Sequence, residues 1–279
     1  MWTRWGGEQD FWEVADVPQE LPERHTRTGL FRLHTDFASQ HLKPRRTVLV
    51  YLPPSYYDSP ERRYPVLYLH DGQNLFDGNT SFIHGQEWRV DETAERLIRA
   101  GKIEPLIIVG IYNTGADRLA EYTPTRDKRG RGGKGEFYSK FLTDELKPFI
   151  DRTYRTRTDA TNTALGGSSL GGLISLWVGL KRPDIFGKLA VLSPSVWWDE
   201  KVILKSVTKK LPLKLWVDIG TSEGDTAVPD TRLLRDALKE KGWKEGSDLA
   251  YHEFEGAGHN EASWAARFDQ VLLFLFPAR

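Results

Sequence analysis

The sequence contains no cysteine among its 279 residues. It therefore forms no disulfide framework and offers neither a thiolate nucleophile nor a cysteine-based metal site. It also lacks an excess of charge, because 39 Lys and Arg residues balance 39 Asp and Glu residues. Nothing in this balance calls for nucleic acid or an anionic membrane surface. We predict a small molecule as the partner, with no nucleic acid and no membrane, and leave a homo-oligomer open.

Long hydrophobic runs are also missing. Residues 1–8 contain no apolar segment like that of a signal peptide, and no later run approaches the roughly 20 apolar residues that a membrane span needs. A signal peptide already removed would not be visible. Because 39% of the residues are hydrophobic, the chain can bury a sizeable core. We predict one soluble, cytoplasmic domain over residues 1–279, with residues 1–29 as an N-terminal arm.

Short apolar strands alternate with helix-like segments along the chain. Continuous apolar runs, such as residues 66–69, are typical of strands that are covered on both faces of a parallel sheet. We predict strands at 30–35, 46–52, 66–69, 105–111, 161–165, 188–192, 214–219 and 249–254, and helices at 88–101, 137–150, 173–180, 231–241 and 262–276. The first two strands are expected to pair antiparallel. The alternation predicts an α/β fold with a mostly parallel central sheet and helices on both faces.

Residues 164–172, with the sequence ALGGSSLGG, join an apolar strand to an apolar helix. They contain the pattern Gly-x-Ser-x-Gly at Gly167, Ser169 and Gly171. This pattern is typical of a nucleophile elbow, in which the apex serine has a strained backbone and the glycines let strand and helix pack closely. A glycine-rich turn without catalytic function is the alternative. The strand–turn–helix context favours the elbow, so we predict Ser169 as a nucleophile.

A serine hydroxyl needs a histidine base and a carboxylate that orients this base. On a fold with a nucleophile elbow, the acid and then the histidine follow the serine along the chain. Only His252 and His259 follow Ser169. His252 lies inside a predicted strand, whereas His259 lies in the glycine-rich loop 256–260 after that strand. We therefore predict His259 as the base.

The acid is expected in the loop after the preceding strand, residues 220–225, which contains Glu223 and Asp225. We predict Glu223 and keep Asp225 as the alternative. Asp218 lies inside the predicted strand and Asp230 has the position of a helix N-cap, so neither is favoured. The elbow, the acid loop and the base loop thus occur in the required order, each at the carboxyl end of a predicted strand.

An oxyanion formed at Ser169 would need backbone N–H donors. Leu170 begins the helix after the elbow and is the first predicted donor. The second is expected in the loop 70–74, which faces the elbow in this architecture, and we predict the N–H of Gln73. His70 and Asp71 in this loop suggest a metal, but no spaced set of further ligands supports one. We therefore predict that Asp71 caps a turn and that no metal or cofactor is used.

Four further side chains are candidates for contact with a substrate. Trp197 and Trp198 follow a predicted central strand and could line an aromatic acyl or sugar pocket, with core packing as the alternative. Arg118 and Glu121 could bind polar groups of a substrate, or pair with each other on the surface. The basic, glycine-rich segment 125–135 predicts either a solvated loop or a lid whose charges meet a polar or anionic substrate.

Five segments carry a family resemblance: YPVLYLHDGQNLFD at 64–77, RLAEYTP at 118–124, the elbow, SPSVWW at 193–198, and GHNE at 258–261 followed by Trp264. Together they resemble the putative-esterase branch of the α/β-hydrolase superfamily, with its enterochelin-esterase-like and carbohydrate-esterase-like proteins. The resemblance runs from about residue 30 to residue 277. It implies an α/β-hydrolase fold and cofactor-free ester hydrolysis through an acyl-enzyme, with Ser169, His259 and Glu223 matching the family's catalytic triad.

These features predict a serine carboxylic-ester hydrolase for short acyl esters, such as acetyl or aromatic acyl groups on a sugar or a similar polar alcohol. Transfer of the acyl group to an alcohol instead of water is one alternative, and hydrolysis of a siderophore-type ester is another. A binding protein that keeps only the fold is a third. The presence of all three catalytic residue types argues against this last alternative.

Overall fold

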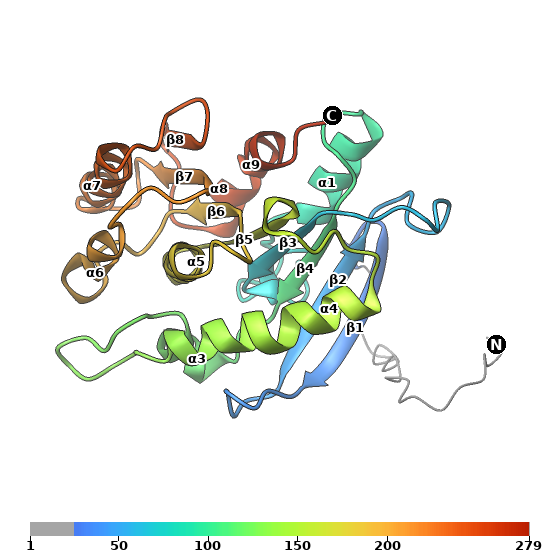
Figure 1. Cartoon of the computed structure of the whole chain (residues 1–279), viewed down its shortest axis with the longest axis horizontal. Coiled ribbons are helices and arrows are strands. Elements are labelled where there is room, and N and C mark those ends of the chain that lie inside the picture. Colours follow the sequence, from blue (N-terminus) through green and yellow to red (C-terminus); the bar gives the residue numbers. More distant parts are fainter. Residues whose placement is uncertain (1–24, 279) are drawn as a thin grey trace.

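The computed structural model describes residues 25–278, and one eight-stranded sheet forms its centre (Figure 1). The strands are β1 (Leu30–Phe37), β2 (Arg46–Leu52), β3 (Val66–His70), β4 (Ile107–Ile111), β5 (Thr163–Ser168), β6 (Lys188–Leu192), β7 (Lys214–Gly220) and β8 (Leu249–Phe254). Their order in the sheet is β1-β2-β4-β3-β5-β6-β7-β8. The pairs β1–β2 and β2–β4 are antiparallel, and the other neighbours are parallel. The predicted sheet and its antiparallel first pair are therefore confirmed.

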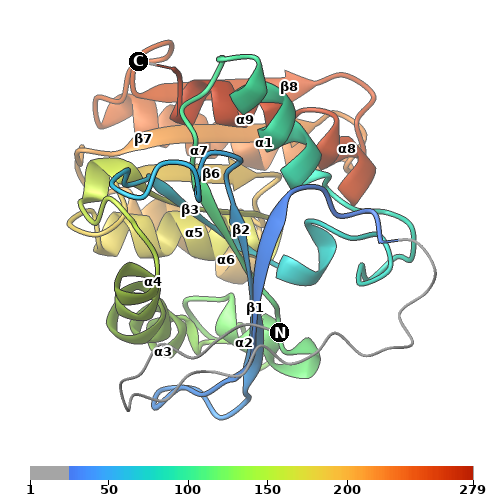
Figure 2. The ribbon, with the colours of Figure 1, turned by 90° about the vertical axis from the view of Figure 1, so that its right-hand side faces the viewer.

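Helices connect most of the strands. They are α1 (Val90–Arg99), α2 (Arg118–Glu121), α3 (Gly135–Lys140), α4 (Lys147–Thr153), α5 (Leu170–Lys181), α6 (Trp198–Ser206), α7 (Ala227–Glu240), α8 (Glu261–Ala265) and α9 (Phe268–Leu275). Short helical turns are η1 (Gly72–Asn74), η2 (Gly115–Asp117), η3 (Phe141–Leu146) and η4 (Ala160–Asn162). Figure 2 shows how strongly the sheet twists, since β1 and β2 run steeply across the direction of β6, β7 and β8.

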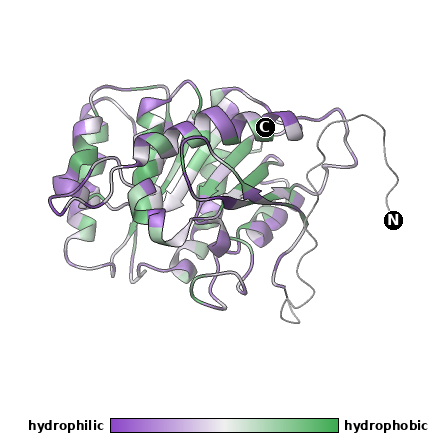
Figure 3. Ribbon diagram, turned by 90° about the horizontal axis from the view of Figure 1, so that it is seen from below, coloured by the Kyte–Doolittle hydropathy of each residue, from purple (hydrophilic) through white to green (hydrophobic). Residues whose placement is uncertain are grey.

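The core consists of two hydrophobic layers, one on each face of the sheet. Successive residues of β2 point to opposite faces, so that Val48 and Val50 join one layer and Leu49 and Tyr51 join the other. The helices α3, α4, α5, α6 and α7 contribute to the first layer, and α1, α8 and α9 contribute to the second. Figure 3 shows the hydrophobic strands between helices of mixed hydropathy. Coverage of both faces explains why the central strands are continuously apolar.

Three predicted helices differ from the structure. The segment 137–150 lies within a longer run formed by α3, the π turn η3 and α4. The helix predicted at 231–241 begins earlier, at Ala227, so Asp230 is not its N-cap and instead pairs with Lys201 at 3.2 Å. The closing helix predicted at 262–276 is divided into α8 and α9 at Arg267, whose side chain points inward and pairs with Asp218.

Two further predictions concern the chain as a whole. Most of the predicted arm, residues 1–24, lies outside the described residues. Among residues 25–278, no helix has both the length and the apolar character needed to cross a membrane.

Candidate active site

Ser169 occupies the sharp turn between β5 and α5. Its backbone has φ 59° and ψ −124°, a conformation that is rare for a residue with a side chain. The neighbouring glycines permit the close approach of this turn to β3, because a Cβ atom on Gly167 or Gly171 would lie 3.1 or 3.3 Å from the His70 Cβ. The local geometry is that of a strained strand-to-helix elbow, which presents the serine at the carboxyl edge of the sheet.

His259 and Glu223 meet at the same edge of the sheet. The Nδ1 atom of His259 lies 2.7 Å from Oε2 of Glu223. The Glu223 side chain is buried, whereas the His259 side chain is 43% exposed. Together with Ser169, both residues line one pocket of about 360 Å³. The structure therefore brings the three predicted catalytic residues to one cavity, while Asp225 is exposed on the surface and does not line it.

The Glu223 carboxylate is held at both of its oxygens. Oε1 accepts hydrogen bonds from the Ser193 hydroxyl at 2.6 Å and from the Gly220 N–H at 2.8 Å, and Oε2 faces His259. Burial alone would raise the pKa of Glu223, but these three partners together hold its pKa below the usual value. The carboxylate is therefore charged at neutral pH and its position is fixed.

Ser193 connects this carboxylate to a buried ion pair. Its hydroxyl oxygen accepts hydrogen bonds from Trp264 Nε1 at 2.9 Å and from Arg267 Nη2 at 2.8 Å, which directs its own proton towards Glu223. Arg267 also donates to Asp218 at 2.8 Å, and its guanidinium is 1% exposed. Burial raises the pKa of Asp218 despite this contact. The result is a continuous buried chain from Asp218 to Glu223.

Neither Ser193 nor Arg267 was predicted from the sequence as a functional residue. Ser193 belongs to the quoted SPSVWW segment, so a signal for it was present. Arg267 stands among apolar residues of the predicted closing helix, where a lone cation indicates a buried partner. Its partner on β7 is 49 positions away and has no local sequence signal.

Ser195 was also missed, and it lies directly beside the elbow. Its hydroxyl oxygen is 3.4 Å from that of Ser169, and its N–H donates to the Ser169 carbonyl at 3.0 Å. Ser195 is buried and lines the same pocket. It therefore fixes the backbone of the elbow and offers a second hydroxyl near that of Ser169.

The two predicted oxyanion donors lie on neighbouring elements. Leu170 is the first residue of α5, where an N–H has no acceptor within its own helix. Gln73 lies in η1, directly after β3, and its side-chain Oε1 accepts from the Asn113 N–H at 3.2 Å. The beginning of this loop is close to the elbow, because a Cβ atom on Gly171 would lie 3.6 Å from an Asp71 carboxylate oxygen. The role of the Gln73 N–H stays a prediction.

The predictions for Arg118 and Glu121 need correction, because the two do not pair with each other. Arg118 forms a two-point ion pair with Asp71, with both N–O distances at 2.7 Å. Glu121 pairs with Arg46 at 2.9 and 3.1 Å, and both of these side chains are almost fully buried. Glu121 therefore cannot contact a substrate, and Arg118 is engaged with a carboxylate of the protein.

The predicted turn-capping role of Asp71 is wrong as well. No side-chain cap bonds the N-terminus of η1, and the Asp71 carboxylate instead binds Arg118 and the Asn113 amide at 2.8 Å. Burial would raise the pKa of Asp71, but the Arg118 guanidinium and these hydrogen bonds hold its pKa below the usual value. Within residues 25–278, no three His, Asp or Glu side chains form a group that could hold a metal ion.

The two tryptophans have different surroundings. Trp197 is 55% exposed and lines the pocket beside Ser169. Trp198 is buried in the core and donates its Nε1–H to the Thr125 carbonyl at 3.1 Å. Core packing is therefore the main role of Trp198, and the predicted contact with a substrate stays open for Trp197.

The basic segment 125–135 is folded into a small bridged loop. Arg126 and Gly132 form an isolated antiparallel bridge, and Asp127 accepts backbone hydrogen bonds from Arg129 and Arg131 at 2.9 Å each. Ion pairs also tie the loop to neighbouring segments, as between Lys128 and Glu200 at 2.5 Å. Most of its charge is thus compensated within the protein, and movement as a lid stays a prediction.

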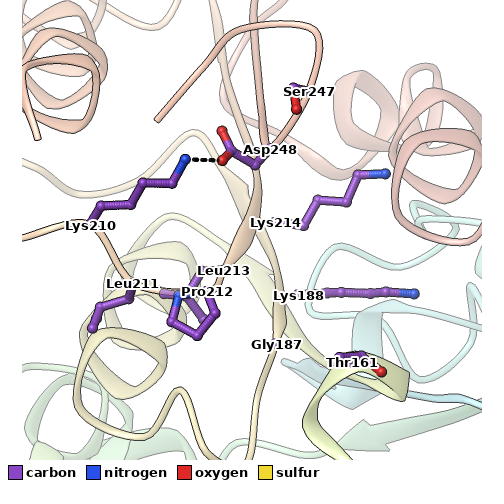
Figure 4. A pocket seen from close by; sticks show the side chains of 10 residues that line it. All are labelled: Thr161, Gly187, Lys188, Lys210, Leu211, Pro212, Leu213, Lys214, Ser247 and Asp248. Carbon is purple, nitrogen blue, oxygen red and sulfur yellow. Dashed lines mark hydrogen bonds and ion pairs between the residues drawn. The ribbon is translucent and has the colours of Figure 1, made fainter. Parts of the chain in front are cut away.

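A second pocket, of about 350 Å³, lies at the opposite edge of the sheet, where β6 and β7 begin (Figure 4). Lys210 is paired with Asp248 there, while the ammonium groups of Lys188 and Lys214 each lie 4.3 Å from the centre of a phenylalanine ring. The pocket contains none of the predicted catalytic residues. In α/β folds, ligands bind at the carboxyl ends of the strands, so we place the candidate site at the Ser169 edge.

Comparisons with known proteins agree with this architecture. A family model described as "Putative esterase" matches residues 39–275. The uncharacterized protein YbbA from Bacillus subtilis is 28% identical over 85% of this chain and 95% of its own length. An endo-1,4-beta-xylanase/feruloyl esterase from Xylanibacter ruminicola is 30% identical over 86% of this chain and 30% of its own length. The ferri-bacillibactin esterase BesA from Bacillus subtilis is 29% identical over 72% of this chain and 75% of its own length.

Solved structures show the same fold. The crystal structure of the BES protein from Bacillus cereus superposes with a TM-score of 0.72, covers 92% of this chain and 98% of its own, and shares 21% of its residues with this chain. The α/β-hydrolase fold that the motifs implied is therefore confirmed.

Proposed function

This chain belongs to the Putative esterase family and is a carboxylic ester hydrolase, and we propose that it works as a serine esterase with Ser169, His259 and Glu223 as its catalytic triad. The observation that carries the proposal is the pocket that these three residues share. Ser169 lines it from a strained elbow, and His259 lines it with one ring nitrogen already engaged by a buried carboxylate.

The proposed reaction has two steps through an acyl-enzyme. Glu223 accepts the Nδ1–H of His259 and so leaves Nε2 available as a base for the Ser169 hydroxyl. The serine oxygen attacks the ester carbonyl, and His259 then passes the proton to the departing alcohol. Water, deprotonated by His259, then attacks the acyl-enzyme. The bond between the acyl carbon and the Ser169 oxygen breaks, His259 returns the proton to this oxygen, and the acid is released.

Backbone donors complete the proposed mechanism. The N–H groups of Leu170 and Gln73 would stabilise the negative charge on the carbonyl oxygen. Loss of one such donor typically lowers turnover by about 10²–10³-fold. The position of Leu170 at the N-terminus of α5 supports its part, since the helix dipole there favours an anion.

For the substrate, we propose a short acyl group, acetyl or aromatic, on a sugar or a similar polar alcohol. The modest pocket of about 360 Å³ and the exposed Trp197 support this class. The relative named endo-1,4-beta-xylanase/feruloyl esterase supports it too. Hydrolysis of a siderophore-type ester is a second candidate, favoured by the similarity to the ferri-bacillibactin esterase BesA. Transfer of the acyl group to an alcohol would use the same acyl-enzyme.

The test compares the parent protein with Ser169→Ala on p-nitrophenyl esters of increasing acyl length, together with labelling by a fluorophosphonate probe. We expect the parent to hydrolyse the short esters and to be labelled, and Ser169→Ala to lose both. If the variant still hydrolysed the esters and were still labelled, Ser169 would not be the nucleophile. Addition of a competing alcohol to the assay separates hydrolysis from acyl transfer, because a transferase would form the new ester in preference to the acid.

A further inference from the structure

Trp197 separates the active-site pocket from a smaller cavity, called the second hollow, which is distinct from the pocket where β6 and β7 begin. The second hollow has a volume of about 210 Å³ and lies between the loop 125–135 and the start of α6. The Trp197 side chain lines both cavities and is 55% exposed. Its neighbour Trp198 is buried beneath it, with the ring centroids 5.8 Å apart. The exposed indole thus forms a wall between the Ser169 pocket and this adjacent hollow.

The backbone just after Trp198 is strained. Asp199, Glu200 and Lys201 have φ values of 42°, 53° and 60°, in the left-handed region that residues with side chains normally avoid. Such a conformation costs about 1–2 kcal/mol per residue. Strain of this kind persists where the surrounding structure holds it, and it is concentrated at functional sites.

Each of these three side chains is tied to a different neighbour. Asp199 accepts a hydrogen bond from the Thr125 hydroxyl at 2.6 Å, Glu200 pairs with Lys128 at 2.5 Å, and Lys201 pairs with Asp230 at 3.2 Å. Two of the contacts reach the loop 125–135, and the third reaches α7 at the rim of the Ser169 pocket. Figure 1 shows this loop extending on the side of the molecule where α6 lies. The strained turn therefore fixes the rim on which Trp197 stands.

The charges around Trp197 indicate which chemistry the hollow accepts. The two cavities are lined by the carboxylates of Asp127, Asp199, Glu200, Glu223 and Asp230 and by the cations Lys128 and Arg129. Asp127 and Asp230 are paired with Arg131 and Lys201, which lie outside this lining. Lys128 is itself paired with Glu200. Because these charges compensate one another, the cavities have no excess of cations that would attract a ligand with several negative charges. A ligand rich in hydroxyl groups can donate hydrogen bonds to the carboxylates and place a ring on the indole.

We propose that the exposed face of Trp197 and the second hollow form a subsite for the alcohol part of the ester, and that this subsite binds an uncharged, hydroxyl-rich ring such as a sugar unit. The inference rests on the proposed esterase function and deepens it. The acyl group occupies the pocket at Ser169, and the alcohol extends over Trp197 into the hollow beside Asp199 and Lys128. The subsite thus selects the alcohol, whereas the triad carries out the chemistry.

The first experiment measures kcat/KM for an acetylated xylotriose and for ethyl acetate, which has the same acyl group but an alcohol part without a ring or a further hydroxyl group. In Trp197→Ala we expect kcat/KM for the xylotriose ester to fall by about tenfold more than kcat/KM for ethyl acetate, because only the sugar lies on the indole. Trp197→Phe keeps an aromatic face and should recover part of the loss. Phe137→Ala removes another half-exposed aromatic side chain that lines neither cavity. It should leave kcat/KM unchanged for both substrates.

The outcomes separate the subsite from the esterase itself. Equal losses on both substrates in Trp197→Ala, or no loss on the xylotriose ester, would overturn the subsite. A selective loss on a ferric catecholate ester instead would also overturn it. If the parent hydrolyses no ester, the proposed function fails, and calorimetric titration with unesterified xylotriose still decides the subsite. Binding by the parent that Trp197→Ala weakens supports it, and no binding, or equal binding by the two proteins, contradicts it.

Discussion

The Ser193 hydroxyl lies 2.6 Å from Oε1 of Glu223, and Ser193 holds this position with a left-handed backbone, at φ 42°. Left-handed backbone at a residue other than glycine is unfavourable, so it persists only where other contacts enforce it. Here those contacts are the hydrogen bonds that Trp264 and Arg267 donate to the Ser193 hydroxyl oxygen. The geometry suggests that the hydroxyl positions the proposed catalytic acid.

We expect Ser193→Ala to lower kcat by about tenfold with little change in KM, because the Glu223 carboxylate loses a charge-assisted hydrogen bond. Stability should fall by about 1–3 kcal/mol, since the buried Trp264 N–H loses its acceptor and Arg267 keeps only its contact with Asp218. Steady-state kinetics and urea unfolding measure the two effects.

Ser193→Gly provides the matched control for the backbone, because glycine relieves the strain and also lacks the hydroxyl. It should lose kcat as Ser193→Ala does. Full activity in Ser193→Gly would show that the hydroxyl is dispensable. Ser139→Ala removes another buried serine hydroxyl, on α3, and should leave kcat unchanged.

The acid assignment can be tested by two amide substitutions in one loop. Glu223→Gln keeps the shape of the side chain but removes its charge and disturbs the tautomer of His259, so we expect kcat to fall by about 10⁴-fold. Asp225→Asn changes an exposed residue outside the pocket and should alter kcat by no more than about twofold. The reverse result would transfer the role to Asp225.

Replacement of Arg118 should make the free energy of unfolding depend less on pH than it does in the parent protein. Arg118→Gln leaves the Asp71 carboxylate largely buried without its cation, so we expect a loss of about 2–3 kcal/mol at pH 7. The ion pair depresses the pKa of Asp71 in the folded protein. Its contribution is therefore present above the unfolded pKa of about 4 and is lost as the pH falls through the folded pKa.

The measurement is urea unfolding of the parent and of Arg118→Gln between pH 7 and pH 3. The gap between their unfolding free energies should narrow on acidification, and a constant gap would contradict the ion-pair explanation. Arg232→Gln is the control, because Arg232 makes a similar two-point contact with Glu253 but is 52% exposed. Its removal should cost no more than about 1 kcal/mol.

Glu121→Gln should damage stability and leave catalysis intact. The change leaves the buried Arg46 guanidinium without its counter-charge, at a cost of about 3–5 kcal/mol. Since Glu121 is fully buried, KM of the folded variant should equal that of the parent. The double variant Arg46→Met with Glu121→Met should regain much of the stability, because a packed apolar pair replaces both charges. A raised KM in Glu121→Gln would instead support the prediction that Glu121 contacts the substrate.

Local signals predicted the strands and the loops that bring the candidate triad together. Each central strand is a continuous apolar run, and the carboxyl ends of parallel strands meet at one edge of the sheet. The residues that follow these strands, Ser169, Glu223 and His259, therefore had to lie near one another once the strand order was given. The elbow glycines added a second local signal.

Pairings between distant residues could not be predicted in this way. The partner of Glu121 lies 75 positions away on β2, and Arg267 contacts Ser193 across 74 positions. Arg118 and Glu121 looked like natural partners because they are three residues apart, a spacing at which helical side chains can meet. Tertiary contacts override that spacing here, since each side chain meets an opposite charge from another segment.

The double anchoring of Glu223 also constrains how this site can evolve. Oε1 binds the Gly220 N–H within its own loop, while Oε2 reaches His259. Aspartate is one methylene shorter, about 1.5 Å, so an aspartate at position 223 would not reach both partners along the same backbone path. A descendant that exchanges the acid must remodel the loop 220–223 in the same lineage. The identity of the acid and the path of its loop must therefore change together.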